Sequence, residues 1–146
     1  MISTKGRYAL RVVIDIAENE NGAPVRLSDV AARQEISLKY LELIIPSLTK
    51  AGIVSSSHGK GGGYRLTVPA DELKVGVVVR AAEGELAPVA CLKEDAAPCD
   101  RAAKCKTLGV WQEYYRLTNA YFDSITVADV IRGNVAFIQE HLTKHA

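Results

Sequence analysis

All three cysteines of this 146-residue chain lie within fifteen residues, in the stretch CLKEDAAPCDRAAKC. Seven residues separate Cys91 from Cys99, and five separate Cys99 from Cys105. The Lys, Glu, Asp, Ala and Pro residues between them are poor material for a hydrophobic core, where an inert cysteine would ordinarily lie. The composition therefore predicts a polar loop whose thiols have a chemical purpose.

The residues alone leave several uses for these thiols open. Structural zinc sites usually contain closely spaced Cys-x-x-Cys pairs, which this loop lacks, so zinc is a minor option. Thiolates also bind iron–sulfur clusters, and nearby cations such as Lys93 and Arg101 would favour thiolates and offset a negative cluster. Free thiols or a switchable disulfide remain alternatives to a cluster, because three cysteines supply only three ligands and the sequence shows no fourth one.

The composition is that of a globular protein with a mildly uneven charge. Apolar residues make up 48% of the chain and charged residues 24%, which is ordinary for one domain. Residues 1–70 carry nine Lys and Arg against six Asp and Glu, whereas residues 71–146 carry nine against eleven. No apolar run reaches the ~18 residues that a membrane span needs, and the start of the chain is too polar for a signal peptide. We therefore expect a cytoplasmic protein with no membrane partner.

Apolar residues at helical spacing predict three helices in the first fifty residues. They cover residues 4–20, residues 27–35 with Ser28 as the cap, and a third helix that begins after Ser37. Pro46 lies inside the third helix and is expected to kink or loosen it, because proline cannot donate a backbone hydrogen bond. The second and third helices outline a helix-turn-helix, although many α-helical proteins contain two packed helices of this kind.

Two β-prone pieces, 53–57 and 64–68, flank a glycine-rich tip and predict a hairpin. After a helix-turn-helix, such a hairpin would be a wing. Glycines at the tip let the backbone approach a phosphate closely, and His58, Lys60 and Arg65 supply charge or hydrogen-bond donors. A Walker phosphate loop needs Ser or Thr after its lysine, whereas Lys60 is followed by glycine and a strand, so only a plain flexible turn remains as the alternative.

The third predicted helix would present its first turns to the major groove of DNA. The hydroxyls of Ser37 and Tyr40 can bond phosphates, Lys39 can reach a phosphate or a guanine, and Glu42 can accept from a cytosine amine. Leu43 is assigned either to the core or to contact with a thymine methyl. The positions expected to face the core are Leu41, Ile44, Ile45 and Leu48.

Further helices are predicted on both sides of the cysteine loop. One covers residues 72–84, one covers 107–125, and the last covers 127–144 after a capping-box start formed by Thr126 and Asp129. The helix over 107–125 has an aromatic-rich face, which we interpret as core or as a dimer seam and not as a cofactor box. That face consists of Leu108, Trp111, Tyr115 and Phe122.

The motifs STKGRYAL, ISLKYLE, KAGIVSS, GGGYRL, VGVVVRAAEG, the cysteine loop and DSITVADV follow one another in the order found in the IscR/NsrR/CymR family. The chain resembles these bacterial winged helix-turn-helix regulators up to about residue 131. The resemblance implies a homodimer that binds a pseudo-palindromic double-stranded DNA operator. Cluster-bearing members sense iron–sulfur status, nitric oxide or redox state, whereas a cysteine-metabolism branch lacks the cysteines and works through a cysteine synthase partner.

Carried over by position, the resemblance makes Ser37, Lys39, Tyr40 and Glu42 the DNA-contacting residues of the third helix. His58 stands where the iron–sulfur regulator has an arginine that enters the minor groove, and Lys60 joins it as a DNA-binding residue of the wing. The three cluster ligands implied are Cys91, Cys99 and Cys105.

Two positions depart from the iron–sulfur regulator type. Leu108 replaces a histidine that follows the last cysteine, and Leu43 replaces a glutamine, so neither the fourth ligand nor the operator sequence can be transferred. In the nitric-oxide-sensing type a carboxylate of the partner's first helix is a ligand, but here the matching stretch has Tyr8 and the nearest acid is Asp15. Neither is assigned.

The sequence thus predicts a mainly α protein: a winged helix-turn-helix domain with a β-hairpin wing (1–83), a cysteine loop for a cluster (84–106), and a long dimerisation helix with a C-terminal helix (107–146). Its expected function is transcription regulation through an iron–sulfur cluster, with 2Fe-2S favoured over 4Fe-4S. The alternative is a regulator of cysteine or sulfur metabolism that uses free thiols or a protein partner. No Cys-x-x-Cys, nucleotide or nucleophile–base motif supports an enzyme.

Overall fold

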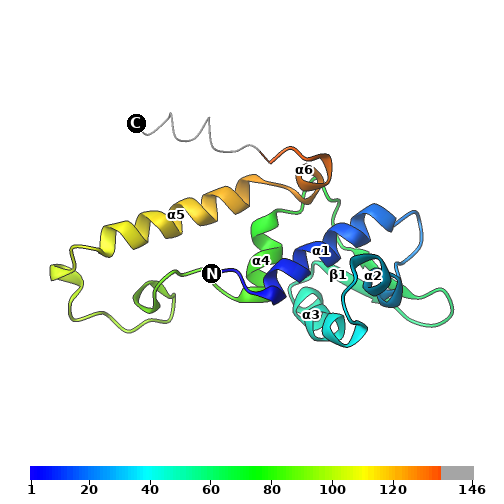
Figure 1. The fold of residues 1–146 in the computed structure, drawn as a ribbon, viewed down its shortest axis with the longest axis horizontal. Helices are drawn as coiled ribbons and strands as arrows, with labels where there is room; N and C mark the ends of the chain where they lie inside the picture. Colours follow the sequence, from blue (N-terminus) through cyan, green and yellow to red (C-terminus); the bar gives the residue numbers. More distant parts are fainter. Residues whose placement is uncertain (136–146) are drawn as a thin grey trace.

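The computed structural model describes residues 1–135, which form a helical head and an arm that extends from it (Figure 1). The head contains the first four helices, the hairpin and the last short helix, and the arm is the fifth helix with the cysteine loop at its far end. The elements are α1 (Thr4–Asn19), α2 (Leu27–Gln34), α3 (Leu38–Lys50), β1 (Val54–Ser57), β2 (Gly63–Leu66), α4 (Val75–Glu83), the 3₁₀ turns η1 (Ala90–Leu92) and η2 (Ala102–Lys104), α5 (Leu108–Ser124) and α6 (Val127–Arg132). The predicted class, mainly α with a hairpin wing, is confirmed.

The core of the head forms where α1 meets α2, α3 and α4. One face of α1 is fully buried, because its apolar residues recur at helical spacing. The four residues of α3 that were predicted to face inward are all buried, so the outer face of that helix is also fixed. The buried residues of α1 and α3 are Ala9, Val12, Val13, Ile16, Leu41, Ile44, Ile45 and Leu48.

The entry to α2 differs from the prediction. Ser28 does not cap this helix: the N-cap residue is Arg26, two positions earlier, and it makes no side-chain cap hydrogen bond. The reason lies in the preceding residue: Val25 exchanges two backbone hydrogen bonds with Tyr64 of the wing, at N–O distances of 2.8 and 2.7 Å. This bridge fixes the chain direction before Arg26, so Ser28 falls inside the first turn.

The predictions for α3 and its neighbours are mostly confirmed. Ser37 caps α3 and its Oγ accepts from the backbone N–H of Tyr40 at 3.2 Å. The helix continues through Pro46 without a break, so the expected loosening does not interrupt it. The turn before α3 is made by Glu35, which adopts a left-handed conformation with φ of 55°.

The predicted hairpin is confirmed, whereas the last helix is shorter than predicted. The strands pair antiparallel with Val54 opposite Leu66 and Ser57 opposite Gly63, as expected for a wing. The predicted capping box of α6 is present: the Thr126 hydroxyl accepts from the Asp129 backbone N–H, and the Thr126 backbone N–H donates to the Asp129 carboxylate and lowers its pKa. The predicted extent of 127–144 is wrong, because α6 ends at Arg132 and Gly133 turns left-handed with φ of 73°. The remainder of that prediction, from residue 136, lies outside the described residues.

Candidate DNA-binding face and cysteine loop

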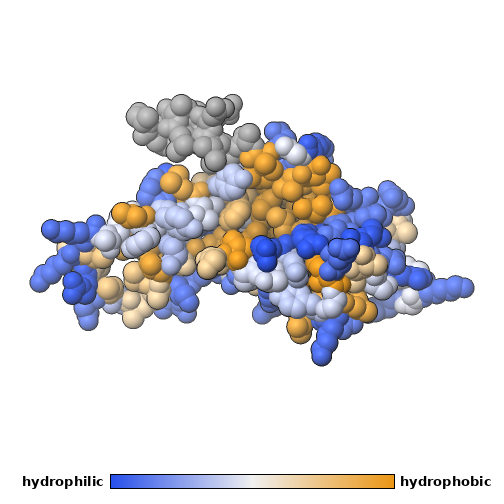
Figure 2. Space-filling view, viewed as in Figure 1, coloured by the Kyte–Doolittle hydropathy of each residue, from blue (hydrophilic) through white to orange (hydrophobic). Residues whose placement is uncertain are grey.

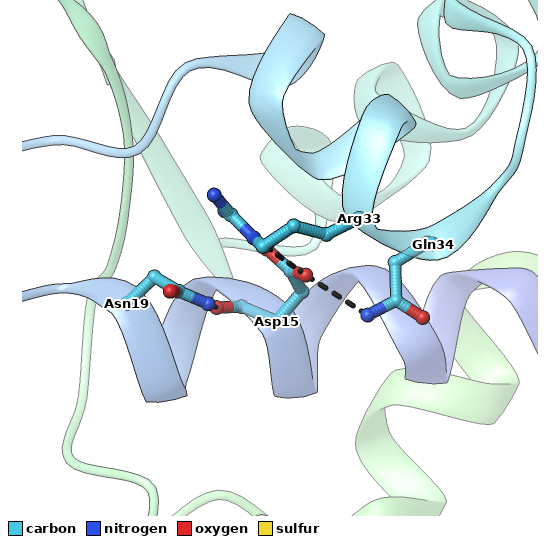
Figure 3. A network of polar contacts seen from close by, with 4 residues as sticks. All are labelled: Asp15, Asn19, Arg33 and Gln34. Atoms are coloured by element: carbon cyan, nitrogen blue, oxygen red, sulfur yellow. Dashed lines mark hydrogen bonds and ion pairs between the residues drawn. The ribbon is translucent and has the colours of Figure 1, made fainter.

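A buried polar network joins the first two helices and positions the helix-turn-helix (Figure 3). Asp15 of α1 is only 1% exposed, and its carboxylate accepts from the Arg33 guanidinium at 2.6 Å and from the Gln34 amide at 2.9 Å. The backbone carbonyl of Asp15 accepts from the Asn19 side chain at 2.8 Å. The hydrogen bond to Asp15 raises the pKa of Arg33. Asp15 is therefore part of the structural core of the head. Its carboxylate is buried and occupied by Arg33 and Gln34, so we do not assign it as a cluster ligand.

The outer face of α3 carries three of its four predicted DNA-contact residues in exposed positions. Ser37, Lys39 and Glu42 are exposed, and Leu43 is 64% exposed, which places it outside the core. Tyr40 is half-buried, and its ring packs edge-on against Tyr8 with the centroids 5.5 Å apart. The Tyr40 ring thus stabilises the contact between α1 and α3, which the sequence reasoning did not anticipate.

The wing tip is open to solvent. His58 and Lys60 are exposed between the strands, and the flanking Gly59 and Gly61 have φ of 87° and 81°, a region that favours glycine. Arg65, which was expected to add charge to this tip, instead donates to the Gly22 carbonyl at 3.0 Å and supports the base of the wing. The free cationic and imidazole groups of the tip are therefore Lys60 and His58.

The three cysteines line one hollow of about 210 Å³ at the far end of the arm. Cys91 and Cys99 are exposed, Cys105 is half-buried, and all three are free thiols. The hollow greatly exceeds the ~10–15 Å³ needed for one water, so a group of several atoms fits in it. The thiols surround this space without meeting at one point, since no three His, Cys, Asp or Glu side chains within residues 1–135 are placed to hold a single metal ion. The remaining described lining residues are Leu92, Ala96, Ala97, Pro98, Ala102, Leu108 and Gln112.

Cys105 has a distinct environment among the three thiols. The Thr107 hydroxyl lies 3.5 Å from its Sγ and lowers the pKa of the thiol, and the backbone N–H of Thr107 acts in the same direction. The structure thereby favours the thiolate form, which is the form that binds metal or reacts with oxidants.

Two polar clamps lie in the last turn of α4, directly before the cysteine loop: one joins α4 to α1 within the head, and the other joins the head to the arm. The Glu83 carboxylate at the end of α4 accepts from the Ser3 backbone at 2.7 Å, from the Ser3 hydroxyl at 2.6 Å and from the Gly6 backbone at 3.1 Å. A side chain at Gly6 would collide with this carboxylate, because an added Cβ would lie 2.1 Å from it. Arg80, also in the last turn of α4, pairs with Asp123 of α5 at 2.5 Å. The loop therefore begins and ends at elements that are tied to the DNA-binding head.

The fifth helix has no buried residue within one chain. Val110, Tyr114 and Leu117 recur at intervals of four and three residues and are 60%, 53% and 39% exposed. Figure 2 shows apolar surface on this side of the molecule where α5 meets α4 and α6. At the other end of α5, Tyr121 and Phe122 pack against the buried residues Val75, Val79 and Ile125. The helix thus contributes to the core at its C-terminal end and exposes an apolar stripe along the rest of its length; the dimer seam stays a prediction.

None of the helices within residues 1–135 combines the length and the apolar character needed to cross a membrane.

A helix-turn-helix with a hairpin wing defines the winged-helix class of fold, and the relatives of this chain are transcription regulators, not enzymes. Residues 2–133 match the Rrf2 family, which is described as iron-dependent transcriptional regulators, and the chain belongs to this family. It is 40% identical over 148 residues to Protein rrf2 of Nitratidesulfovibrio vulgaris, covering 97% of this chain and 98% of that protein. It is 35% identical over 133 residues to the regulator IscR of Photobacterium profundum, covering 91% and 76%.

Solved structures of related regulators have the same fold. The global cysteine regulator CymR of B. subtilis is 33% identical, with a TM-score of 0.71 over 89% of this chain and 95% of that one. IscR of T. potens is also 33% identical, with a TM-score of 0.70 over 98% and 96%. Similar scores to an IscR and to a CymR mean that the fold alone does not choose between these two kinds of regulator.

Proposed function

We propose that this protein is a homodimeric, DNA-binding repressor that senses iron–sulfur, redox or nitric oxide status through a 2Fe-2S cluster held by Cys91, Cys99 and Cys105. The observation that carries the proposal is that the three thiols share one hollow. Mainly apolar walls and free, partly exposed thiols fit such a group, and donors spread around a space suit a cluster of several atoms more than a single ion. When bound, the cluster would supply a centre that responds to oxidants and to small ligands.

In this proposal the head binds the operator. Exposed Ser37, Lys39 and Glu42 present hydroxyl, ammonium and carboxylate groups on the outer face of α3, where a recognition helix meets base edges. Tyr40 contributes its hydroxyl from a ring that is anchored on Tyr8. At the wing, His58 reaches toward the minor groove and the Lys60 ammonium neutralises a phosphate.

The two clamps in the last turn of α4 give the arm a route by which it would influence DNA binding. Glu83 ties the start of the cysteine loop to the beginning of α1, and Arg80 ties α4 to the end of α5. A change of the loop would therefore act on helices that belong to the head. Regulation requires in addition that the cluster-bearing and cluster-free forms differ in DNA affinity.

A second candidate function is a regulator of cysteine or sulfur metabolism without a cluster, working through free thiols or a partner such as a cysteine synthase. The similarity to CymR and the lowered pKa of Cys105 favour it, because a reactive thiolate needs no metal.

Anaerobic reconstitution with ferrous iron and sulfide separates the two functions. We expect wild-type protein to hold iron and sulfide and to absorb visible light, and we expect Cys91→Ala, Cys99→Ala and Cys105→Ala each to lose most of both, because every cysteine lines the hollow. Asp95→Ala, an exposed change in the same loop at a residue that does not line the hollow, is the control and should retain the cluster. Wild-type protein that holds no iron would replace the cluster proposal by the thiol or partner mechanism.

The dimer seam is tested by placing a charge on α5. We expect Leu117→Asp to raise the dimer dissociation constant by at least ~100-fold, about 2.7 kcal/mol, because a carboxylate would lose its hydration in an apolar seam. Val68→Asp is the matched control, since Val68 is 38% exposed and Leu117 39% exposed, but Val68 lies in the head. Sedimentation velocity over a concentration series measures both. Equal behaviour of the two variants would place the seam elsewhere.

A further inference from the structure

Gln112 is the one polar side chain among the described residues that line the hollow beside the cysteines. The other lining residues besides the thiols are leucine, alanine and proline, which offer no side-chain donor atom to a metal. The loop carboxylates Glu94, Asp95 and Asp100 do not line it, and Glu85 accepts from the Glu94 backbone at 2.9 Å.

Gln112 lies on the face of α5 that borders the hollow. Gln112 follows Leu108 by four residues, so both lie on the same face of the helix, and both line the hollow. Side chains in a helix lean toward its N-terminus, so the carboxamide of Gln112 covers the turn that starts at Leu108. That turn follows directly from Cys105, whose carbonyl accepts from the Leu108 N–H at 3.3 Å.

We propose that the Gln112 side-chain oxygen is the fourth protein ligand of the cluster, an inference that rests on the proposed function. Iron–sulfur clusters of this kind use four protein ligands, and three thiolates leave one place to fill. A neutral carboxamide oxygen completes the set without adding charge, and it binds more weakly than a thiolate. The iron at this position is therefore the one most open to an incoming small ligand, while the three thiolates keep the cluster attached to the loop.

The experiment compares wild type, Gln112→Leu and Gln112→Glu after anaerobic reconstitution with ferrous iron and sulfide. Leucine removes the oxygen at similar size, and glutamate places an anionic oxygen at the same position. We expect Gln112→Leu to lose its iron to EDTA about 10- to 100-fold faster than wild type, the range typical for losing a group that supports a metal site. We expect Gln112→Glu to keep iron at least as long as wild type and to shift the electron paramagnetic resonance spectrum of the reduced cluster.

Arg116→Gln is the control on the same helix, because Arg116 lies one turn further along, is exposed and does not line the hollow. It should match wild type in both measurements. If wild type holds a cluster and both Gln112 variants match it in iron retention and spectrum, the assignment of Gln112 is overturned while the proposed function stands. If wild type holds no iron, the proposed function itself has failed.

Discussion

Replacing Arg33 by alanine is expected to lower the free energy of unfolding by about 3 kcal/mol. The Asp15 side chain is 2% exposed, so removing its cationic partner leaves a buried carboxylate that still accepts a hydrogen bond from the Gln34 amide. Breaking such a pair typically costs ~3–5 kcal/mol, and the remaining donor argues for the lower end of that range. Urea unfolding at fixed protein concentration measures the loss.

Replacing Asp15 should destabilise the protein less than replacing Arg33. The Arg33 side chain is 39% exposed and can be solvated when Asp15 is neutralised, so Asp15→Asn is expected to cost less, about 1–2 kcal/mol. Arg132→Ala is the control, because its pair with Asp71 is 62% and 64% exposed and should contribute less than about 1 kcal/mol. If Arg33→Ala were as mild as Arg132→Ala, the network of Figure 3 would not stabilise the helix-turn-helix.

Operator binding by the dimer is expected to weaken steeply with salt. A protein that contacts six to ten phosphates loses roughly 10³–10⁵ in affinity between 50 and 200 mM salt, with a log–log slope of about −0.9 per phosphate. Lys60→Ala should make the slope shallower by about 0.9 for each wing and weaken all DNA sequences alike, because its ammonium is exposed at the wing tip. Fluorescence anisotropy over a salt series measures the slope, and a flat response would argue against the head as the DNA-binding unit.

Glu42→Ala is the matched comparison for Lys60→Ala. A base contact by Glu42 predicts a change in discrimination of about 1–3 kcal/mol at one base position, with little change in the salt slope. Half-sites should lie about one helical turn apart, ~34 Å. If both variants lost affinity equally on specific and random DNA, the division of roles between α3 and the wing would be wrong.

Local signals in the sequence were sufficient for most of the head. The Ser37 cap, the inward spacing of α3, the hairpin and the Thr126–Asp129 capping box were all predicted and are present. Each depends on residues within a few positions of one another, because a cap or a helical stripe is formed by neighbours in the chain.

Errors arose where a distant contact overrides a local preference. The backbone bridge between Val25 and Tyr64 decides where α2 begins. The Arg65 guanidinium donates to the Gly22 carbonyl and is therefore not part of the wing tip. The last helix was extended too far because its apolar spacing continued past Gly133, whereas the left-handed glycine ends it.

By itself, the sequence determined that this protein has a winged-helix head and a polar loop with three thiols, since caps, periodicity and composition are properties of short segments. Only the tertiary structure decided what those side chains meet. Asp15 pairs with Arg33 across 18 positions, and Glu83 holds Ser3 across 80. The thiols share their hollow with Gln112 because the loop folds back on the first turns of α5. Such contacts are set by the packing of whole helices, so no spacing within a single segment encodes them.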